Sequence, residues 1–142
     1  MKEALLDQVA NPLPEVSPQP HPSIRKILLV EDHELVAYSI QVVLRTKGYD
    51  VRRVANGSAA WRLLSKGLEE FDLVLTDLNM PLMHGDELIG LLRQHQYKGK
   101  IFLITSELDP LELRHIKSLK VDQILFKPIK PNEILSAISQ QQ

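Results

Sequence analysis

The sequence contains no cysteine, which excludes disulfides and thiolate metal sites. It has no excess of charge of one sign, since 17 basic and 18 acidic side chains give a formal net charge of -1. We therefore expect no binding to nucleic acid or to an anionic membrane surface. No hydrophobic run approaches the roughly 18 apolar residues of a membrane span, and the acidic start is unlike a signal peptide. A soluble, cytoplasmic protein without membrane insertion is expected.

Proline is concentrated near the start of the chain. Five prolines fall within residues 11–22, where apolar side chains are few. This composition is typical of an extended arm or a linker. We therefore divide the chain into an N-terminal proline-rich arm or linker, residues 1–23, and a folded domain, residues 24–142, which is long enough to bury a core of its own.

From residue 26 onward, short apolar runs alternate with segments of helical period. This alternation is typical of α/β units that build a parallel sheet. Strands are expected over residues 26–31, 50–54, 72–76, 101–105 and 123–126, and helices over residues 34–47, 57–67, 85–96, 109–118 and 131–140. Because these five βα units account for the folded domain, the predicted fold class is α/β, with a doubly wound sheet of five parallel strands.

The first predicted helix carries two apolar stripes. The stripe expected to face the core consists of Val36, Ile40, Val43 and Leu44, and Gly48 is placed to end the helix. The second stripe consists of Leu35, Tyr38 and Val42, roughly 150° around the helix at about 100° per residue. A partner protein could cover this stripe, the N-terminal arm could cover it, or it could be exposed by chance. The residues alone do not decide between these alternatives.

Ionisable side chains stand at the ends of three predicted strands. Glu31 and Asp32 follow the first apolar run. Asp77 ends the third run, and Lys127 ends the fifth. Because ligands of open parallel sheets bind at the carboxyl ends of the strands, we expect these groups to converge on one crevice.

The chemistry of this set points to phosphoryl transfer. Clustered carboxylates repel one another, so the site should also hold a cation or a lysine for the carboxylates to stay ionised. Oxygen ligands of this kind suit Mg²⁺, while Lys127 can neutralise a phosphoryl oxygen and Thr105 or Ser106 can donate a hydrogen bond. Together these groups describe a carboxylate poised to accept a phosphoryl group. Strand-end acids also cap helices, so Asp32 could cap the first helix, and Asp109 is expected to cap the fourth.

The order and spacing of these groups resemble the receiver domains of two-component response regulators, the CheY-like superfamily. The resemblance runs over residues 24–139. It rests on four segments: ILLVED at residues 27–32, DLVLTDLNMPLMHG at residues 72–85, ITS at residues 104–106 and FKP at residues 126–128. It implies a (βα)5 flavodoxin-like receiver fold.

The resemblance also implies a role for each residue of the site. Asp77 is then the phosphoacceptor, Thr105 the switch hydroxyl and Lys127 the lysine that binds the phosphoryl group. The family commonly holds the peptide bond between Lys127 and Pro128 in the cis form. The implied ligands of Mg²⁺ are Asp32 and Asp77 directly, Glu31 through a water molecule, and the backbone carbonyl of Asn79.

The function implied by the resemblance is signalling by phosphotransfer. The phosphoryl group comes from a sensor histidine kinase or a histidine phosphotransfer protein, and the chain then contacts a downstream protein target. The chain catalyses at most its own phosphotransfer and autodephosphorylation, as a monomer or weak dimer. We expect the phosphodonor to dock on the second stripe of the first helix together with the loop around Lys130.

Two alternatives to this function stay open. One is an interaction module that works without phosphorylation, favoured by Ile124, which stands where the family usually carries an aromatic residue three positions before the lysine. The other is a receiver fragment of a hybrid histidine kinase. A phosphohydrolase of the aspartyl-phosphate kind is disfavoured, because Asn79 stands where such sites carry a second aspartate.

Overall fold

Five parallel strands form one sheet in the order β2-β1-β3-β4-β5, in the computed structural model, which describes residues 23–141. The strands are β1 (Lys26–Val30), β2 (Asp50–Val54), β3 (Leu73–Asp77), β4 (Lys100–Thr105) and β5 (Gln123–Phe126). Each lies within one residue of its predicted bounds. The predicted fold class is therefore confirmed. The predicted arm, residues 1–23, falls outside the described residues except for Ser23.

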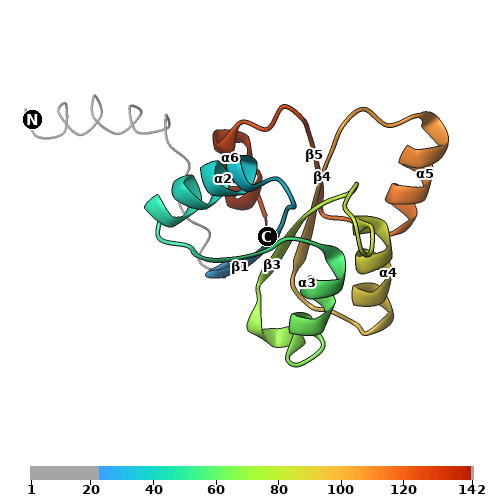
Figure 1. Cartoon of the computed structure of the whole chain (residues 1–142), viewed down its shortest axis with the longest axis horizontal. Coiled ribbons are helices and arrows are strands. Elements are labelled where there is room, and N and C mark those ends of the chain that lie inside the picture. Colours follow the sequence, from blue (N-terminus) through green and yellow to red (C-terminus); the bar gives the residue numbers. More distant parts are fainter. Residues whose placement is uncertain (1–22, 142) are drawn as a thin grey trace, which may run out of the picture.

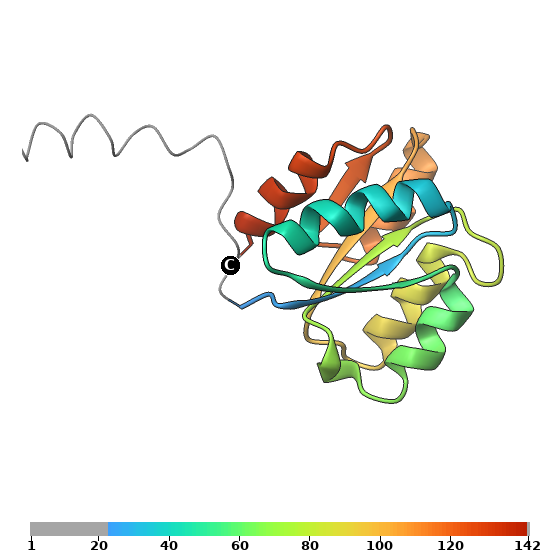
Figure 2. The same cartoon turned by 60° about the vertical axis from the view of Figure 1, so that its left-hand side comes forward.

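Helices cover both faces of the sheet (Figures 1 and 2). One face is covered by α2 (Glu34–Thr46) and α6 (Pro131–Ser139). The other is covered by α3 (Gly57–Leu64), α4 (Gly85–Gln94) and α5 (Pro110–Ser118), and the short 3-10 helix η2 (Leu68–Glu70) precedes β3. Within residues 23–141, no helix has the length and the apolar content that crossing a membrane requires.

Alternating residues of the buried strands supply two separate cores. In β1, Ile27 and Leu29 pack in the core under α2 and α6, whereas Leu28 and Val30 pack in the core under α3, α4 and α5. All four side chains are fully buried. Burial of each such side chain contributes about 2 kcal/mol. The central strands are therefore apolar on both faces, which leaves their ends as the place for polar chemistry.

Helix ends agree with the sequence at two positions and differ at a third. Gly48 follows the end of α2 with a φ of 93°, a left-handed conformation that favours glycine. Asp109 caps α5, because its side chain accepts a hydrogen bond from the Glu112 amide at 2.8 Å. The prediction for α3 was too long: the helix ends at Leu64, and the chain turns where the Gly67 amide bonds to the Leu64 carbonyl.

Candidate functional site

The three acidic residues predicted at the strand ends meet at the carboxyl edge of the sheet. Glu31 and Asp32 follow β1, and Asp77 is the last residue of β3, which pairs with β1. One carboxylate oxygen from each residue lies within 4.8 Å of the other two. Glu31 and Asp77 are buried, whereas Asp32 is exposed. The cluster is thus a set of hard oxygen ligands that is open to solvent on one side.

Lys127 reaches this cluster from the loop that follows β5. Its Nζ donates a hydrogen bond to Asp77 Oδ2 at 2.9 Å. The backbone of the loop is held by a bond from the Lys127 amide to the Thr105 carbonyl and by a cis peptide bond to Pro128. Partial burial lowers the pKa of Lys127, but the hydrogen bond and charge of Asp77 outweigh it and raise the pKa above its ordinary value. The lysine therefore stays charged beside Asp77.

Glu31 is the member of the cluster whose ionised form is disfavoured by burial. Burial, with a further contribution from the charge of Asp77, raises the pKa of Glu31 from 4.5 to about 7, although the His33 amide donates to Glu31 Oε2 at 3.0 Å. Two buried oxygens, Glu31 Oε1 and Asp77 Oδ1, have no hydrogen-bond partner within residues 23–141. Buried carboxylate oxygens need a compensating donor or cation. The donor set and its two unpaired oxygens therefore fit a hard divalent cation.

A cleft of about 470 Å³ opens over the cluster. Its lining consists of Glu31, Asp32, His33, Val36, Ser39, Asp77, Asn79, Lys127, Pro128 and Ile129. We call this the acidic cleft. It brings together all of the predicted site residues except Thr105. Its remaining wall is formed by α2, through Val36 and Ser39, and by Pro128 and Ile129 after Lys127.

Thr105 does not line the acidic cleft. It is the last residue of β4 and is almost fully buried, one position beyond Ile104, which pairs with Asp77. Its register partner on β5 is Phe126, whose ring is half exposed. Ile124 packs in the core under α3, α4 and α5, so an aliphatic side chain occupies the position where the family usually has an aromatic ring.

Two residues next to the cluster have structural roles. His33 caps α2 by accepting a hydrogen bond from the Val36 amide at 3.5 Å, so Asp32 does not fill that position. Gly85 begins α4 against the backbone of the strand end, where an added Cβ would lie 2.2 Å from the Asp77 carbonyl oxygen. Glycine is needed there because of this close approach, which brings the loop after Asp77 back onto β3.

Arg53 is a residue that the sequence did not reveal. It lies on β2, and its Nε donates to the Glu31 carbonyl at 2.9 Å while its Nη2 donates to the Asp32 carbonyl at 3.2 Å. The signal that could have identified it is the pair of charged residues, Arg52 and Arg53, in the middle of a strand.

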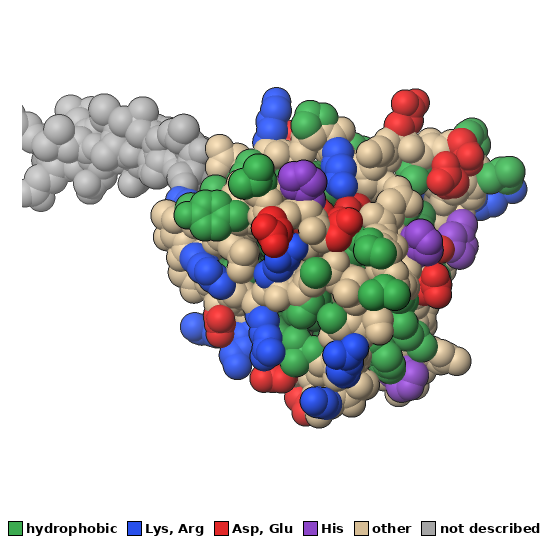
Figure 3. All heavy atoms as spheres, viewed as in Figure 1, with side chains coloured by type: hydrophobic (Ala, Val, Ile, Leu, Met, Phe, Trp, Pro, Cys, Tyr) green, Lys and Arg blue, Asp and Glu red, His purple; other side chains and the backbone are tan. Residues whose placement is uncertain are grey.

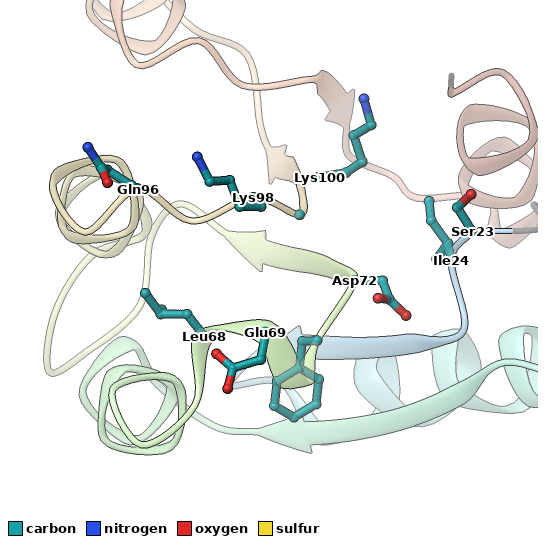
Figure 4. A pocket seen from close by; sticks show the side chains of 10 residues that line it. Ser23, Ile24, Leu68, Glu69, Asp72, Gln96, Lys98 and Lys100 are labelled. Atoms are coloured by element: carbon teal, nitrogen blue, oxygen red, sulfur yellow. The ribbon is translucent and has the colours of Figure 1, made fainter.

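A larger cavity, of about 580 Å³, lies at the opposite edge of the sheet (Figure 4). Asp72, Lys98 and Lys100 line it together with apolar side chains such as Ile24 and Phe71. None of the residues of the acidic cleft takes part. Size therefore does not identify the site. The cluster of buried carboxylates beside a lysine does, because these groups have the chemistry of a reaction centre.

Comparison with known proteins gives consistent matches. Residues 27–139 match the family model described as a response regulator receiver domain. The probable transcriptional regulator ycf29 of Pyropia yezoensis is 33% identical over 116 residues, which cover 80% of this chain and 51% of that protein. The sensor protein EvgS of Escherichia coli (strain K12) is 30% identical over 119 residues, which cover 84% of this chain and 10% of that protein. This chain thus spans about half of the first relative and a small part of the second.

A solved structure agrees with both the fold and the sequence. The chemotaxis response regulator CheY4 of Vibrio cholerae superimposes with a TM-score of 0.74 at 30% sequence identity. The superposition covers 82% of this chain and 98% of that chain.

Proposed function

This chain belongs to the response regulator receiver domain family, and we propose that it accepts a phosphoryl group on Asp77 from the phosphohistidine of a partner protein. The observation that carries the proposal is a buried carboxylate that is hydrogen-bonded to a lysine and lies near two further acids. Lys127 Nζ donates to Asp77 Oδ2 at 2.9 Å, and one carboxylate oxygen of Asp77 lies within 4.8 Å of an oxygen of Glu31 and of Asp32. The partner is a sensor histidine kinase or a histidine phosphotransfer protein. The product then acts through contact with a downstream protein.

The metal ion of the site is Mg²⁺ in this proposal. Asp32 and Asp77 would hold it directly, Glu31 would hold it through water, and Asn79 would add its backbone carbonyl. The support is the all-oxygen donor set with two unpaired buried oxygens. When bound, Mg²⁺ neutralises charge on the carboxylates and on the phosphoryl oxygens.

The chain's own residues perform the transfer in three roles. An Asp77 oxygen attacks phosphorus, the P–N bond breaks, and its electron pair leaves with the imidazole of the donor, which takes up a proton. Lys127 exchanges its contact with Asp77 Oδ2 for one with a phosphoryl oxygen and so stabilises the charge. Thr105 turns its hydroxyl from the end of β4 toward the same group, and this movement carries the signal to the surface of α5 and β5.

The surface beside the acidic cleft suits a protein partner. Leu35, Tyr38 and Val42 of α2 are 75%, 67% and 44% exposed, and Figure 3 shows hydrophobic side chains gathered over that helix. We name these three residues the α2 patch. Since α2 begins two residues after Asp32, a domain docked on the α2 patch and on the loop around Lys130 could reach Asp77 with a histidine. Apolar area beside a reaction centre is typical of a docking surface.

The test is the intact mass of the chain after incubation with Mg²⁺ and acetyl phosphate. The wild-type chain should gain the mass of one phosphoryl group, and Asp77→Asn should gain none while keeping its circular dichroism spectrum. The adduct should also be absent when a chelator removes Mg²⁺. An adduct on Asp77→Asn would show that a different residue accepts the phosphoryl group.

A second function has support from one position. Ile124 provides no aromatic ring to follow Thr105, which favours an interaction module that does not respond to phosphorylation. A wild-type chain that binds Mg²⁺ but gains no phosphoryl group would support this alternative.

A further inference from the structure

Glu31 and Asp32 lie in a loop, so the hydrogen bonds of a strand or a helix do not hold their backbone. Residues 31–33 connect β1 to α2, and the Glu31 side chain is fully buried. A buried backbone requires partners for its amides and carbonyls. Here the partners come from β2, an edge strand that contributes no carboxylate to the acidic cleft.

Residues of β2 form hydrogen bonds with both the amide and the carbonyl of Glu31. The Glu31 amide donates to the Val54 carbonyl at 3.1 Å, and the Glu31 carbonyl accepts from Arg53 Nε at 2.9 Å. The same guanidinium continues to the Asp32 carbonyl, which accepts from Arg53 Nη2 at 3.2 Å. One side chain therefore spans the two successive residues whose carboxylates face Asp77.

We propose that Arg53 is a positioning residue of the acidic cleft, which holds the backbone of Glu31 and Asp32 so that their carboxylates bind the divalent cation. This proposal rests on the function proposed above. Arg53 touches neither the carboxylates nor the reacting atoms in the contacts described. It acts through the two carbonyls, so its effect should fall on the affinity for Mg²⁺ and not on the chemistry of transfer.

The shape of the guanidinium explains why arginine is required. Its donors are fixed in one plane at the spacing of a fork, whereas a lysine ammonium is a single point of charge. Lysine at position 53 would keep the charge near the cluster but could not bond both carbonyls in the same way. Arg53→Lys therefore separates positioning from simple electrostatic attraction.

The chain provides a matched control in the preceding residue. Arg52 belongs to the same strand and is exposed, and alternation along β2 directs it to the opposite face of the sheet from Arg53. A change at Arg52 alters the net charge equally. It leaves the bonds to Glu31 and Asp32 in place.

The experiment measures Mg²⁺ binding by isothermal titration calorimetry on the full chain and on Arg53→Met, Arg53→Lys and Arg52→Met. Partners that orient metal ligands typically contribute about tenfold to a hundredfold in affinity. We expect Arg53→Met and Arg53→Lys to weaken binding by about tenfold or more, and Arg52→Met to change it less than twofold. Thermal unfolding identifies folded samples, and Arg53→Lys serves as the second variant if Arg53→Met does not fold.

Phosphorylation by acetyl phosphate supplies a second readout. In the Arg53 variants the Mg²⁺ concentration for half-maximal rate should rise by the same factor as the dissociation constant, while the rate at saturating Mg²⁺ stays near the wild-type value. Mg²⁺ affinity in Arg53→Met and Arg53→Lys equal to that of Arg52→Met would overturn the proposal. Failure of every Arg53 variant to fold would also overturn it, since Arg53 would then serve stability.

The two proposals fail in different ways. If the wild-type chain binds Mg²⁺ but gains no phosphoryl group, the proposed function fails, and the binding data still decide the role of Arg53. If the wild-type chain binds no Mg²⁺ at millimolar concentration, both fail.

Discussion

Acidic side chains lie at both edges of the same sheet, but their surroundings are opposite. At the amino edge, Asp72 Oδ2 accepts hydrogen bonds from the amides of Arg25 and Lys26 at 2.9 and 3.0 Å. Asp122 Oδ2 accepts from the Ile101 amide at 2.8 Å. These carboxylates tie strands together. Backbone amides donate hydrogen bonds to both carboxylates.

At the carboxyl edge, the acids are left short of partners. Glu31 Oε1 and Asp77 Oδ1 are buried without a hydrogen bond in the described part of the chain, and only Lys127 Nζ contacts Asp77 Oδ2. Carboxylates thus stabilise the sheet at its amino edge, whereas the unpaired buried carboxylate oxygens at its carboxyl edge cost stability. Unpaired carboxylate oxygens of this kind are where a cation can bind with most effect.

Among the substitutions that test this difference between the two edges, Gly85→Ala is expected to have the largest effect. In Gly85→Ala the new Cβ would lie 2.2 Å from the Asp77 carbonyl oxygen and 2.9 Å from Leu78 Cα, so the backbone at the acidic cleft must move. We expect the free energy of unfolding to fall by about 3 kcal/mol, together with loss of phosphoryl acceptance. Chemical denaturation and intact mass measure these effects.

The control for Gly85→Ala lies on the same helix. An added Cβ at Gly90 meets no atom within 4 Å, so Gly90→Ala should stabilise α4 by up to about 1 kcal/mol. Equal stability of the two variants would contradict the close approach of α4 to Asp77.

The second prediction tests whether the ionised Glu31 carboxylate lowers the free energy of unfolding. Because the pKa of Glu31 is about 7 in the folded chain and 4.5 otherwise, its proton stabilises the fold fully below pH 4.5, and this contribution is lost as the pH rises through 7. Without Mg²⁺, Glu31→Gln should not show that loss. At pH 8 the variant should be more stable than the wild type by about 2 kcal/mol.

Urea denaturation at several pH values, with a chelator present, measures this difference. The gap between Glu31→Gln and wild type should close as the pH falls toward 4.5. A variant that is less stable than wild type at pH 8 would mean that the ionised Glu31 carboxylate does not destabilise the fold.

An effect of similar size and opposite sign is expected at the amino edge. Asp72→Ala removes the acceptor for the amides of Arg25 and Lys26, which should lower the free energy of unfolding by about 2 kcal/mol. Its Mg²⁺ affinity by calorimetry should equal that of the wild type. Asp50→Ala, at an exposed residue of β2, is the control and should change stability by less than about 0.5 kcal/mol. A large change in Mg²⁺ affinity in Asp72→Ala would mean that the two edges are coupled.

The smallest effect concerns the surface beside the carboxyl edge. Replacing Tyr38 and Val42 of the α2 patch by alanine should slow phosphotransfer from a histidine kinase by about tenfold, close to 1.4 kcal/mol in the barrier. The donor is the kinase that labels the wild-type chain fastest in a purified panel. The reaction with acetyl phosphate should stay unchanged, because it requires no docking.

Leu111→Ala is the control for the α2 patch. Leu111 is 73% exposed on α5, which lies on the other face of the sheet. Its replacement should leave transfer from the kinase unaltered. If the variants of Tyr38, Val42 and Leu111 all behave alike, the α2 patch does not dock the donor.

Most of the fold could be predicted from the sequence because its signal is local. Apolar runs of three or four residues define β1, β3 and β4, and a run can be recognised without knowing its neighbours. The end of α3 could not be placed in the same way. The predicted last residues instead form the turn in which the Gly67 amide bonds to the Leu64 carbonyl, and local patterns define helix ends less sharply than helix interiors.

The site was predicted in part for the same reason. Glu31, Asp32, Asp77 and Lys127 could be selected because each ends an apolar run, and the structure brings them into one acidic cleft. The burial of Thr105 could not be predicted, since a residue's exposure depends on the strands beside it.

What the sequence by itself determined is the alternation of strands and helices and the kind of side chain that stands at each strand end, because hydrophobic period and turn residues act over a few positions. What only the tertiary structure decided is which of those groups touch. Lys127 meets Asp77 across 50 positions, and Arg53 meets Glu31 across 22. These contacts depend on strand order and register, which arise from the packing of the two cores as a whole and not from any one segment.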